Sequence, residues 1–166
     1  MTIFRHTDGS RISLANGGIE ERLAALEGAE TARIILAKYA TAVDGQDLGA
    51  VSSLLDRAVV LSIGEMTVDG YKDVVDFFRS AFVDDPAQKS HFVTNMAPRW
   101  LGDGNVHIDA YFMWTAGEES KSIIGWGTYS NRVKVKEGTG KLTKIEIAIR
   151  HMGEIGEGWT FGSEPV

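Results

Sequence analysis

Residues 105–116 read NVHIDAYFMWTA, and this stretch decides the fold class. Its apolar residues fall on both alternating sets of positions and are largely β-branched or aromatic, which is typical of a long strand with two apolar faces. Similar stretches cover about 89–101, 120–135 and 141–152, separated by the turn sequences GDG (102–104), GE (117–118) and EGTG (137–140). The second half of the chain therefore predicts an antiparallel meander of four long strands.

The first half of the chain is mainly helical. Apolar residues recur at three- and four-residue steps from Ile19, which predicts a helix that ends at Gly45, with Gly28 separating a short first turn from the main part. Asp47 can cap a short helix that follows. A hairpin at 58–63 and 66–69 and an amphipathic helix of about three turns beginning near Gly70 complete this half.

Helices followed by long antiparallel strands indicate the α+β class, with the helices packed on one face of a strongly bent sheet. At 166 residues the chain suits one domain. We expect an N-terminal arm at 1–18, the domain at 19–155 and a C-terminal tail at 156–166. Apolar residues on both faces of 106–114 further predict a homodimer or homotrimer formed through the outer face of the strands.

Composition excludes several classes of function. The net charge of −6 disfavours nucleic acid and anionic membrane as partners. The chain has no cysteine, which rules out disulfides and thiolate chemistry, and its four histidines are dispersed, so we expect no metal and no organic cofactor. No stretch reaches the roughly 20 apolar residues that a membrane helix needs, and no secretory signal is evident, so we expect a cytoplasmic protein.

Two segments can carry chemistry, YATAVDGQD (39–47) and HFVTN (91–95). Strand alternation places His91, Val93 and Asn95 on one face, and a helix lying across that strand would bring Asp44 to His91. Neutral imidazole is a competent base near pH 7, and a carboxylate on its second nitrogen fixes the tautomer and stabilises the imidazolium. A phenol such as Tyr39 could donate a hydrogen bond to a carbonyl or a leaving oxygen.

Each of these residues also has a structural interpretation. A single histidine on a strand is more often a structural residue, an aspartate before glycine often ends a helix, and a tyrosine on an apolar helical face is often core. Arg150 follows a row in which Ile145, Ile147 and Ile149 alternate with polar residues, so it could equally lie on a solvent-facing row. A bulge would be needed to bring Arg150 inside.

The order Y-x4-D-x2-D, a helix, a hairpin and then H-x3-N at the start of a long strand resembles the SnoaL-like branch of the nuclear-transport-factor-2-like superfamily. The resemblance covers about residues 20–155 and implies a cone-shaped, cystatin-like fold with an internal pocket. This branch includes scytalone dehydratase, bile acid 7α-dehydratase, hexachlorocyclohexane dehydrochlorinase and polyketide cyclases, and the β subunits of ring-hydroxylating dioxygenases share the fold.

By position, the resemblance implies that Asp44 and His91 are the catalytic pair, that Tyr39 is a donor near them, and that Arg150 is an arginine of the last strand. The aromatic residues of the strands and of the helix after the hairpin could line an apolar pocket. The residues expected to contact substrate are Phe78, Asn95, Trp114, Trp126 and Tyr129.

These features favour a cofactor-independent lyase or isomerase, most of all a dehydratase, which acts on a small hydrophobic molecule with His91 as general base and Asp44 as its partner. Two alternatives remain open at this point. One is a non-catalytic ligand-binding or assembly subunit resembling the dioxygenase β subunits, and the other is a polyketide cyclase that closes rings by aldol chemistry. A hydrogen bond between Asp44 and His91 beside an open pocket would favour catalysis.

Overall fold

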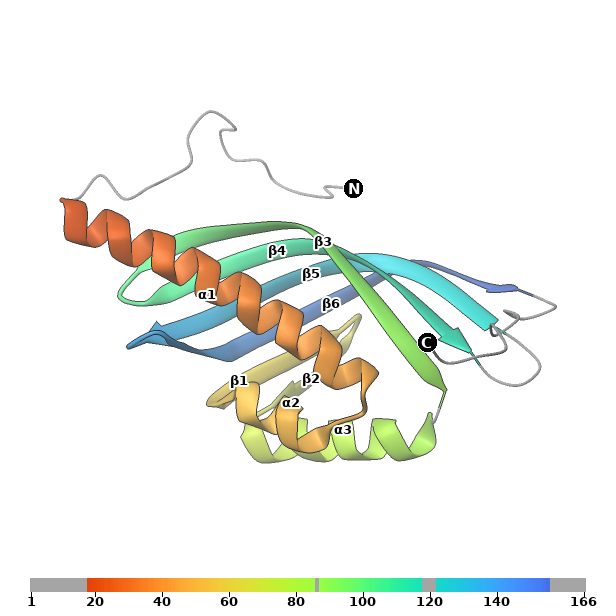
Figure 1. Cartoon of the computed structure of the whole chain (residues 1–166). Coiled ribbons are helices and arrows are strands. Elements are labelled where there is room, and N and C mark those ends of the chain that lie inside the picture. Colours follow the sequence, from red (N-terminus) through yellow and green to blue (C-terminus); the bar gives the residue numbers. More distant parts are fainter. Residues whose placement is uncertain (1–17, 86, 118–121, 156–166) are drawn as a thin grey trace, which may run out of the picture.

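The computed structural model describes residues 18–85, 87–117 and 122–155 (Figure 1). The expected C-terminal tail and the expected N-terminal arm, apart from Gly18, lie outside the described residues. In chain order the elements are α1 (Ile19–Asp44), α2 (Leu48–Leu54), β1 (Leu55–Ile63), β2 (Met66–Asp69), α3 (Tyr71–Asp84), β3 (Gln88–Gly102), β4 (Asn105–Gly117), β5 (Ser122–Lys136) and β6 (Thr139–Ile155).

The strands form one curved sheet in the order β2-β1-β6-β5-β4-β3. The predicted antiparallel meander is confirmed for β3 to β6, whose neighbours pair antiparallel in sequence order. β1 pairs parallel with β6, so the whole sheet is mixed. A parallel pair needs a long crossover connection, and here the segment from β2 to β5 provides it.

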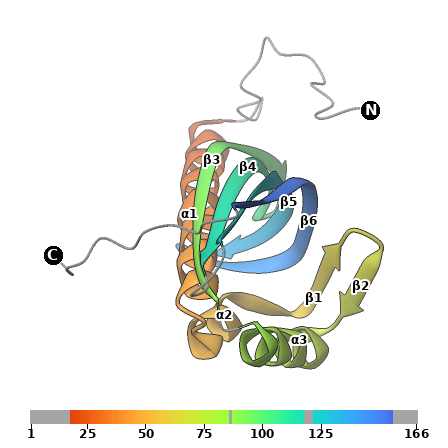
Figure 2. The same ribbon diagram turned by 90° about the vertical axis from the view of Figure 1, so that its right-hand side faces the viewer.

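Helix α1 crosses the concave face of this sheet, which curls from β3 beside the helix round to β1 and β2 (Figures 1 and 2). α3 packs against β1 and β2 at the far side of the molecule (Figure 2). The α+β class and the helix-on-bent-sheet arrangement are therefore confirmed. No helix in the described part of the chain is both long and apolar enough to cross a membrane.

The local signals for helix ends are confirmed in the first half. α1 ends at Asp44, and Gly45 donates its N–H to the carbonyl of Thr41 at 3.0 Å. Asp47 caps α2 by accepting a hydrogen bond from the N–H of Ala50 at 2.8 Å. These two stops redirect the chain within a few residues, so α2 packs directly beside the end of α1.

The prediction that Gly28 separates two helical parts is wrong, because α1 is continuous through it. Gly28 is buried where the helix approaches the sheet, and a Cβ placed there would lie 2.7 Å from the ring of Trp100. The helix face on the sheet carries mostly small residues in its first half, including Ala25 and Ala32. Glycine at position 28 thus permits close packing rather than a break.

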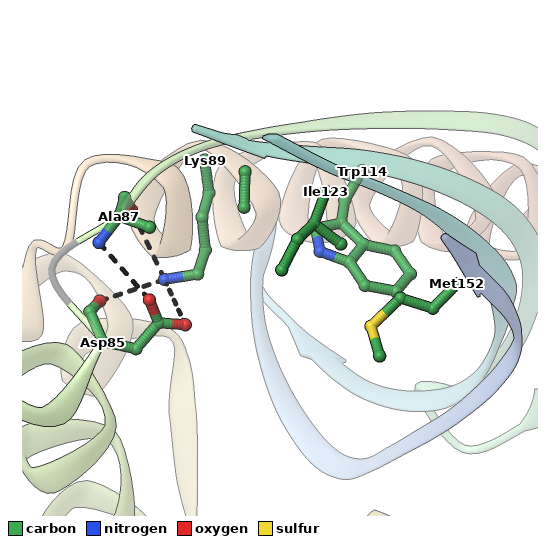
Figure 3. A pocket seen from close by; sticks show the side chains of 7 residues that line it. Asp85, Ala87, Lys89, Trp114, Ile123 and Met152 are labelled. Carbon is green, nitrogen blue, oxygen red and sulfur yellow. Dashed lines mark hydrogen bonds and ion pairs between the residues drawn. The ribbon is translucent and has the colours of Figure 1, made fainter. Parts of the chain in front are cut away.

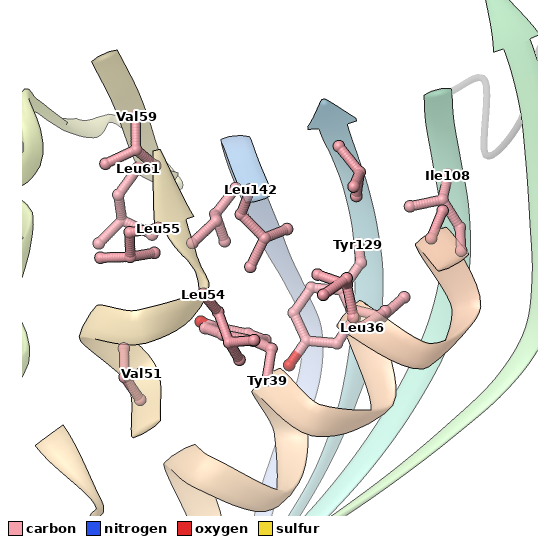
Figure 4. Packing of buried hydrophobic residues seen from close by; sticks show 14 of the residues in the cluster. Leu36, Tyr39, Val51, Leu54, Leu55, Val59, Leu61, Ile108, Tyr129 and Leu142 are labelled. Atoms are coloured by element: carbon pink, nitrogen blue, oxygen red, sulfur yellow. The ribbon is translucent and has the colours of Figure 1, made fainter. Parts of the chain in front are cut away.

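The apolar residues that open the helical pattern lie on the outer side of α1. Ile19 is 81% exposed, and Leu23, Leu26 and Ile34 are also exposed. The core lies on the opposite side, where Leu36 and Tyr39 meet side chains from the sheet and from α2 (Figure 4). The buried residues labelled there come from α1, α2 and four strands; they are Leu36, Tyr39, Val51, Leu54, Leu55, Val59, Leu61, Ile108, Tyr129 and Leu142.

Replacing Gly28 with leucine should destabilise the fold. The new side chain has to displace Trp100, and forcing extra volume into a packed interior costs about 1–3 kcal/mol, more than the roughly 1 kcal/mol of helix propensity gained. Urea unfolding followed by circular dichroism measures this change. The matched control is Ala37→Leu on the exposed side of the same helix, which should stay within about 0.5 kcal/mol of the parent. Equal stability of the two variants would contradict the packing role of Gly28.

Candidate active site

The end of α1 and the start of β3 are joined by a carboxylate. Asp44 Oδ1 lies 2.5 Å from His91 Nδ1, and Asp44 Oδ2 accepts the backbone N–H of His91 at 2.8 Å. The two side chains are partly buried, at 12% exposed for His91 and 23% for Asp44. Both carboxylate oxygens thus bind one residue, which fixes the imidazole in place.

This geometry determines which nitrogen of His91 is available. With Asp44 accepting a hydrogen bond from Nδ1–H, the neutral ring presents Nε2 as a proton acceptor. Nε2 has no hydrogen-bond partner among the described residues. The ring lies over the inner face of the sheet, 6.0 Å from the centroid of Phe112. The pair therefore has the arrangement of a base with an orienting carboxylate.

A cavity of about 150 Å³ lies at the end of the sheet where β3 begins (Figure 3). It is lined by Asp85, Ala87, Lys89, Trp114, Ala116, Ile123 and Met152. Trp114 is the direct cross-strand neighbour of His91, and Lys89 lies two residues before His91 on the same strand. Asp44 and His91 are not among the residues that line the cavity, and Lys89 and Trp114 are the lining residues next to His91 in the sheet.

The polar side of the cavity is an ion pair. Lys89 Nζ lies 2.9 Å from Asp85 Oδ2 and also donates to the backbone carbonyls of Asp85 and Ala87, at 3.1 and 3.4 Å (Figure 3). The opposite side is apolar and consists of Trp114, Ile123 and Met152 (Figure 3). Gln46 Nε2 donates to the carbonyl of Asp85 at 3.0 Å and ties this wall to the end of α1.

Two glycines of β5 make room for the aromatic side chains of the inner face. A Cβ at Gly125 would lie 2.1 Å from the ring of Trp114, and a Cβ at Gly127 would lie 2.7 Å from the ring of Phe112. Both rings therefore pack closely against β5 at positions that have no side chain, and the two glycines provide the space for them.

Comparison with known proteins gives the family. The profile of the SnoaL-like domain matches residues 24–146, which is most of the chain. The chain belongs to the SnoaL-like domain family. No curated protein matches it by sequence. The match includes Asp44 and His91 and ends before Arg150.

Solved structures share the fold of this SnoaL-like domain. A protein of Novosphingobium aromaticivorans named provisionally as a scytalone dehydratase has a TM-score of 0.69 and 12% identity over 85% of this chain and 94% of that chain. Hexachlorocyclohexane dehydrochlorinase type 3 of Novosphingobium barchaimii has a TM-score of 0.71 and 15% identity over 80% and 93%. A second N. aromaticivorans protein, named provisionally as an aromatic ring hydroxylase, has a TM-score of 0.68 and 20% identity over 78% and 94%. Such identities establish the fold alone.

The SnoaL-like domain buries three of the predicted site residues in its core. Tyr39 is 1% exposed and makes edge contacts with Phe78 and Tyr129, at centroid distances of 6.1 and 6.2 Å. Burial raises the pKa of Tyr39. Burial also raises the pKa of Tyr129, with smaller contributions from Tyr39 and Asp44. These aromatic residues pack behind Asp44, and none of them lines the cavity.

Three other predicted site residues lie away from the pair. Asn95 was expected on the face of His91, but it is exposed with φ +52° at a bulge where two residues of β3 oppose one of β4. Trp126 points to the outer face of the sheet, where it is 42% exposed and stacks on His151. The alternation assumed for Asn95 was therefore wrong, and Trp126 cannot line this cavity.

Arg150 occupies the bulge that was thought necessary to bring it inside. Trp126 pairs with His151 and Gly127 pairs with Ile149, so Arg150 is the extra residue of β6. Its side chain is nevertheless exposed and forms no ion pair with the described residues. The bulge changes which face the following residues occupy, and through it Met152 reaches the cavity.

Sequence reasoning missed the polar wall of the cavity. Lys89 could have been found, because strand alternation from His91 places it on the same face. Ile123 could have been found by pairing the predicted strands 105–116 and 120–135 antiparallel, since it then lies opposite Ala116. Met152 could not, because its face depends on the bulge at Arg150. Among the described residues, no group of three or more histidine, aspartate or glutamate side chains is arranged to hold a metal ion.

Asp44→Ala should destabilise the protein as well as alter the site. The substitution removes the acceptor of two hydrogen bonds, one of them to a partly buried imidazole, and hydrogen bonds to charged groups contribute about 1.5–3 kcal/mol each. We expect a loss of about 2–4 kcal/mol in urea unfolding, and a smaller loss for Asp44→Asn, which keeps an acceptor oxygen. An unfolding midpoint unchanged in Asp44→Ala would show that this contact does not hold α1 to β3.

Proposed function

We propose that this SnoaL-like domain is a cofactor-independent lyase or isomerase of dehydratase type that acts on a small hydrophobic molecule. The observation that carries the proposal is the Asp44–His91 pair, whose neighbours on the inner face of the sheet, Lys89 and Trp114, line a cavity. His91 is the general base, and Asp44 holds its tautomer and stabilises the imidazolium. We assign no role in the reaction to Tyr39 or Arg150, because Tyr39 is packed in the core and Arg150 is exposed.

In the proposed reaction Nε2 of His91 takes a proton from carbon. The electrons of that C–H bond form a double bond as the leaving group departs from the neighbouring carbon, or return to another carbon in an isomerisation. The imidazolium carries the positive charge next to the carboxylate of Asp44, which is already in contact with its Nδ1. No nucleophilic side chain is required, which agrees with the absence of cysteine from the sequence.

The names of two structural neighbours support this direction. A dehydratase and a dehydrochlorinase both carry out eliminations, of water and of hydrogen chloride, and both share this fold with the chain. A carbon base is the common requirement of such eliminations. At 12% and 15% identity these neighbours support the reaction type and leave the substrate open.

Two other functions remain candidates. The neighbour named provisionally as an aromatic ring hydroxylase favours a binding or assembly subunit, in which the Asp44–His91 pair would only join α1 to β3. A polyketide cyclase would use the same base to form a carbon–carbon bond. Proton removal from carbon separates the first of these from the enzyme proposals, since only an enzyme accelerates it through His91.

His91→Ala should abolish proton removal from a carbon acid. We propose following the exchange of the α-protons of cyclohexanone with deuterium by NMR, and the dehydration of 3-hydroxycyclohexanone by the absorbance of the enone. Loss of a general base typically costs about 10²- to 10⁴-fold in rate. Asp44→Asn should fall in the same range, and the double variant should be little slower than His91→Ala, because the two residues act as one unit.

Two observations bear on that result. His107→Ala is the matched control, because His107 forms the other histidine–aspartate contact, to Asp109 at 2.8 Å on the outer face of the sheet. Its rates should equal those of the parent. Near-normal rates in His91→Ala, with the fold intact by circular dichroism, would favour the binding subunit.

We also propose that the chain self-associates through the outer face of the sheet. Phe92, Met113 and Trp126 are large apolar side chains on that face and are 54%, 40% and 42% exposed. Phe92 and Met113 are cross-strand neighbours, and Met113 pairs with Trp126, so the three form one row across β3, β4 and β5. A continuous exposed apolar row of this kind suits a contact between copies of the chain.

Light scattering at micromolar concentration should therefore give a dimer or a trimer of the 18.1 kDa chain. Met113→Lys places a charge in the middle of the row and should shift the population towards the monomer. The control is Val83→Lys, which changes an exposed apolar residue of α3 away from the sheet and should leave the mass unchanged. A monomer in the parent protein would rule out this interface.

A further inference from the structure

The proposed elimination needs a group that receives the departing oxygen, and the residues predicted for that task do not reach the cavity. Tyr39 is fully packed between Phe78 and Tyr129, and Arg150 is exposed on β6. Loss of hydroxide without a proton donor or a cation is slow, because charge then develops on an oxygen without stabilisation. The cavity does contain one cationic side chain, that of Lys89.

Lys89 is placed opposite the apolar wall and next to the base. Lys89 and His91 are two residues apart on β3, so their side chains point to the same face about 7 Å apart. The Lys89 side chain is only 17% exposed, and its Nζ contacts Asp85 at the cavity edge. A small ring lying on Trp114 would therefore meet Nε2 of His91 with one carbon and the ammonium of Lys89 with a neighbouring substituent.

The volume of the cavity limits the substrate. An apolar cavity of about 150 Å³ accepts one benzene-sized ring. This cavity has the same volume, and its apolar wall is made of Trp114, Ala116, Ile123 and Met152. Trp114 packs against Gly125 and presents an aromatic side chain to such a ring.

We propose that Lys89 is the electrophilic catalytic residue of this site and that the cavity binds a single six-membered ring bearing a hydroxyl or an oxyanion. This inference rests on the proposed function and names its substrate class. Asp85 serves as the counter-ion of Lys89 while the cavity is empty. The bound ring places its oxygen against Nζ, which exchanges part of its contact with Asp85 for a contact with substrate.

The step balances in atoms and charge. His91 Nε2 takes a proton from the ring carbon, and the electron pair of that C–H bond becomes the second bond of a carbon–carbon double bond. The adjacent C–O bond breaks, its electron pair stays on oxygen, and the oxygen receives a proton from the Lys89 ammonium. Water leaves. The imidazolium of His91 and the neutral amine of Lys89 then return to their starting states by proton exchange through solvent.

The interaction with an oxyanion can be tested without knowing the substrate, using 4-nitrophenol as the probe. Its phenolate is coloured, so absorbance at fixed pH reports both binding and ionisation, and 4-nitrotoluene is a matched ligand without the oxygen. We expect the parent protein to bind the phenolate form preferentially. Lys89→Met should weaken binding of the phenolate about 10- to 100-fold, as expected for loss of a charged hydrogen bond, and leave 4-nitrotoluene unchanged. Lys89→Arg should restore much of the preference.

Asp85→Asn separates a catalytic lysine from a merely structural ion pair. If Lys89 binds oxyanions, removing its counter-ion should strengthen phenolate binding, opposite to the effect of Lys89→Met. If the pair only holds the segment before β3, both variants should weaken both ligands together, which would overturn the proposal. Lys136→Met, which removes an exposed lysine charge of β5, is the control for net charge and should change nothing.

The location of the probe is tested by Gly125→Ala, since the new Cβ would push the Trp114 ring into the cavity and should abolish binding of both ligands. A parent protein that binds neither ligand, or a Lys89→Met variant with unchanged phenolate affinity, would overturn the inference. The proposed function stands or falls separately. If His91→Ala slows proton exchange and Lys89→Met does not change phenolate binding, His91 is supported as the base and the role of Lys89 is rejected. If Lys89→Met weakens phenolate binding and His91→Ala does not slow proton exchange, the ring site is supported and the role of His91 as base is rejected.

Discussion

The rest of the site depends on two hydrogen bonds that the Asp44 carboxylate accepts, one from the imidazole and one from the backbone N–H of His91. It joins the last residue of the longest helix to the start of an edge strand 47 residues later. Because the acceptor is a charged group with both oxygens engaged, a shift of the helix along the strand would break both bonds at once. The position of α1 over the sheet and the orientation of the base are therefore set by the same interaction.

The sheet provides a surface on which that orientation is useful. Aromatic side chains can pack closely against the inner face only where the neighbouring strand has no side chain, and Gly125 and Gly127 supply two such places. Gly28 has the same effect on α1, where it lets Trp100 approach the helix. The cavity lies at the other end of the sheet, where β3 begins and His91 is located.

How far sequence could lead is visible from particular residues. Asp44, Gly45 and Asp47 act through local geometry, and the long strands follow from composition and turns, so their predictions hold. The face predicted for Asn95 is wrong because Asn95 lies in a bulge, and one additional residue reverses the alternation that sequence reasoning assumes. Arg150 is exposed, as the alternative of a solvent-facing row had it, although it also lies in a bulge. Trp126 and Gly125 are adjacent, and only the register with Trp114 determines that glycine faces inward. The resemblance implied a pocket, and Trp114 does line the cavity, but the other lining residues were not predicted because the position of the cavity results from the spacing of elements rather than from any one segment.

The charges at the open end explain why such a site can exist in an acidic protein. Two carboxylates lie close to the cavity, and each is matched to a different cation or potential cation: Asp44 to His91, and Asp85 to Lys89. The first pair is held by two short contacts, from Asp44 to the imidazole and to the backbone N–H of His91. The second pair joins Lys89 to Asp85, and the side chain of Asp85 is 55% exposed. A carboxylate in water gives up a cation at little cost, because solvent replaces the contact. Lys89 can therefore exchange its contact with Asp85 for a contact with a ligand oxygen, while Asp44 keeps His91 in place to take the proton from carbon. This combination suits an elimination, in which two neighbouring atoms of a ring must be contacted at the same time.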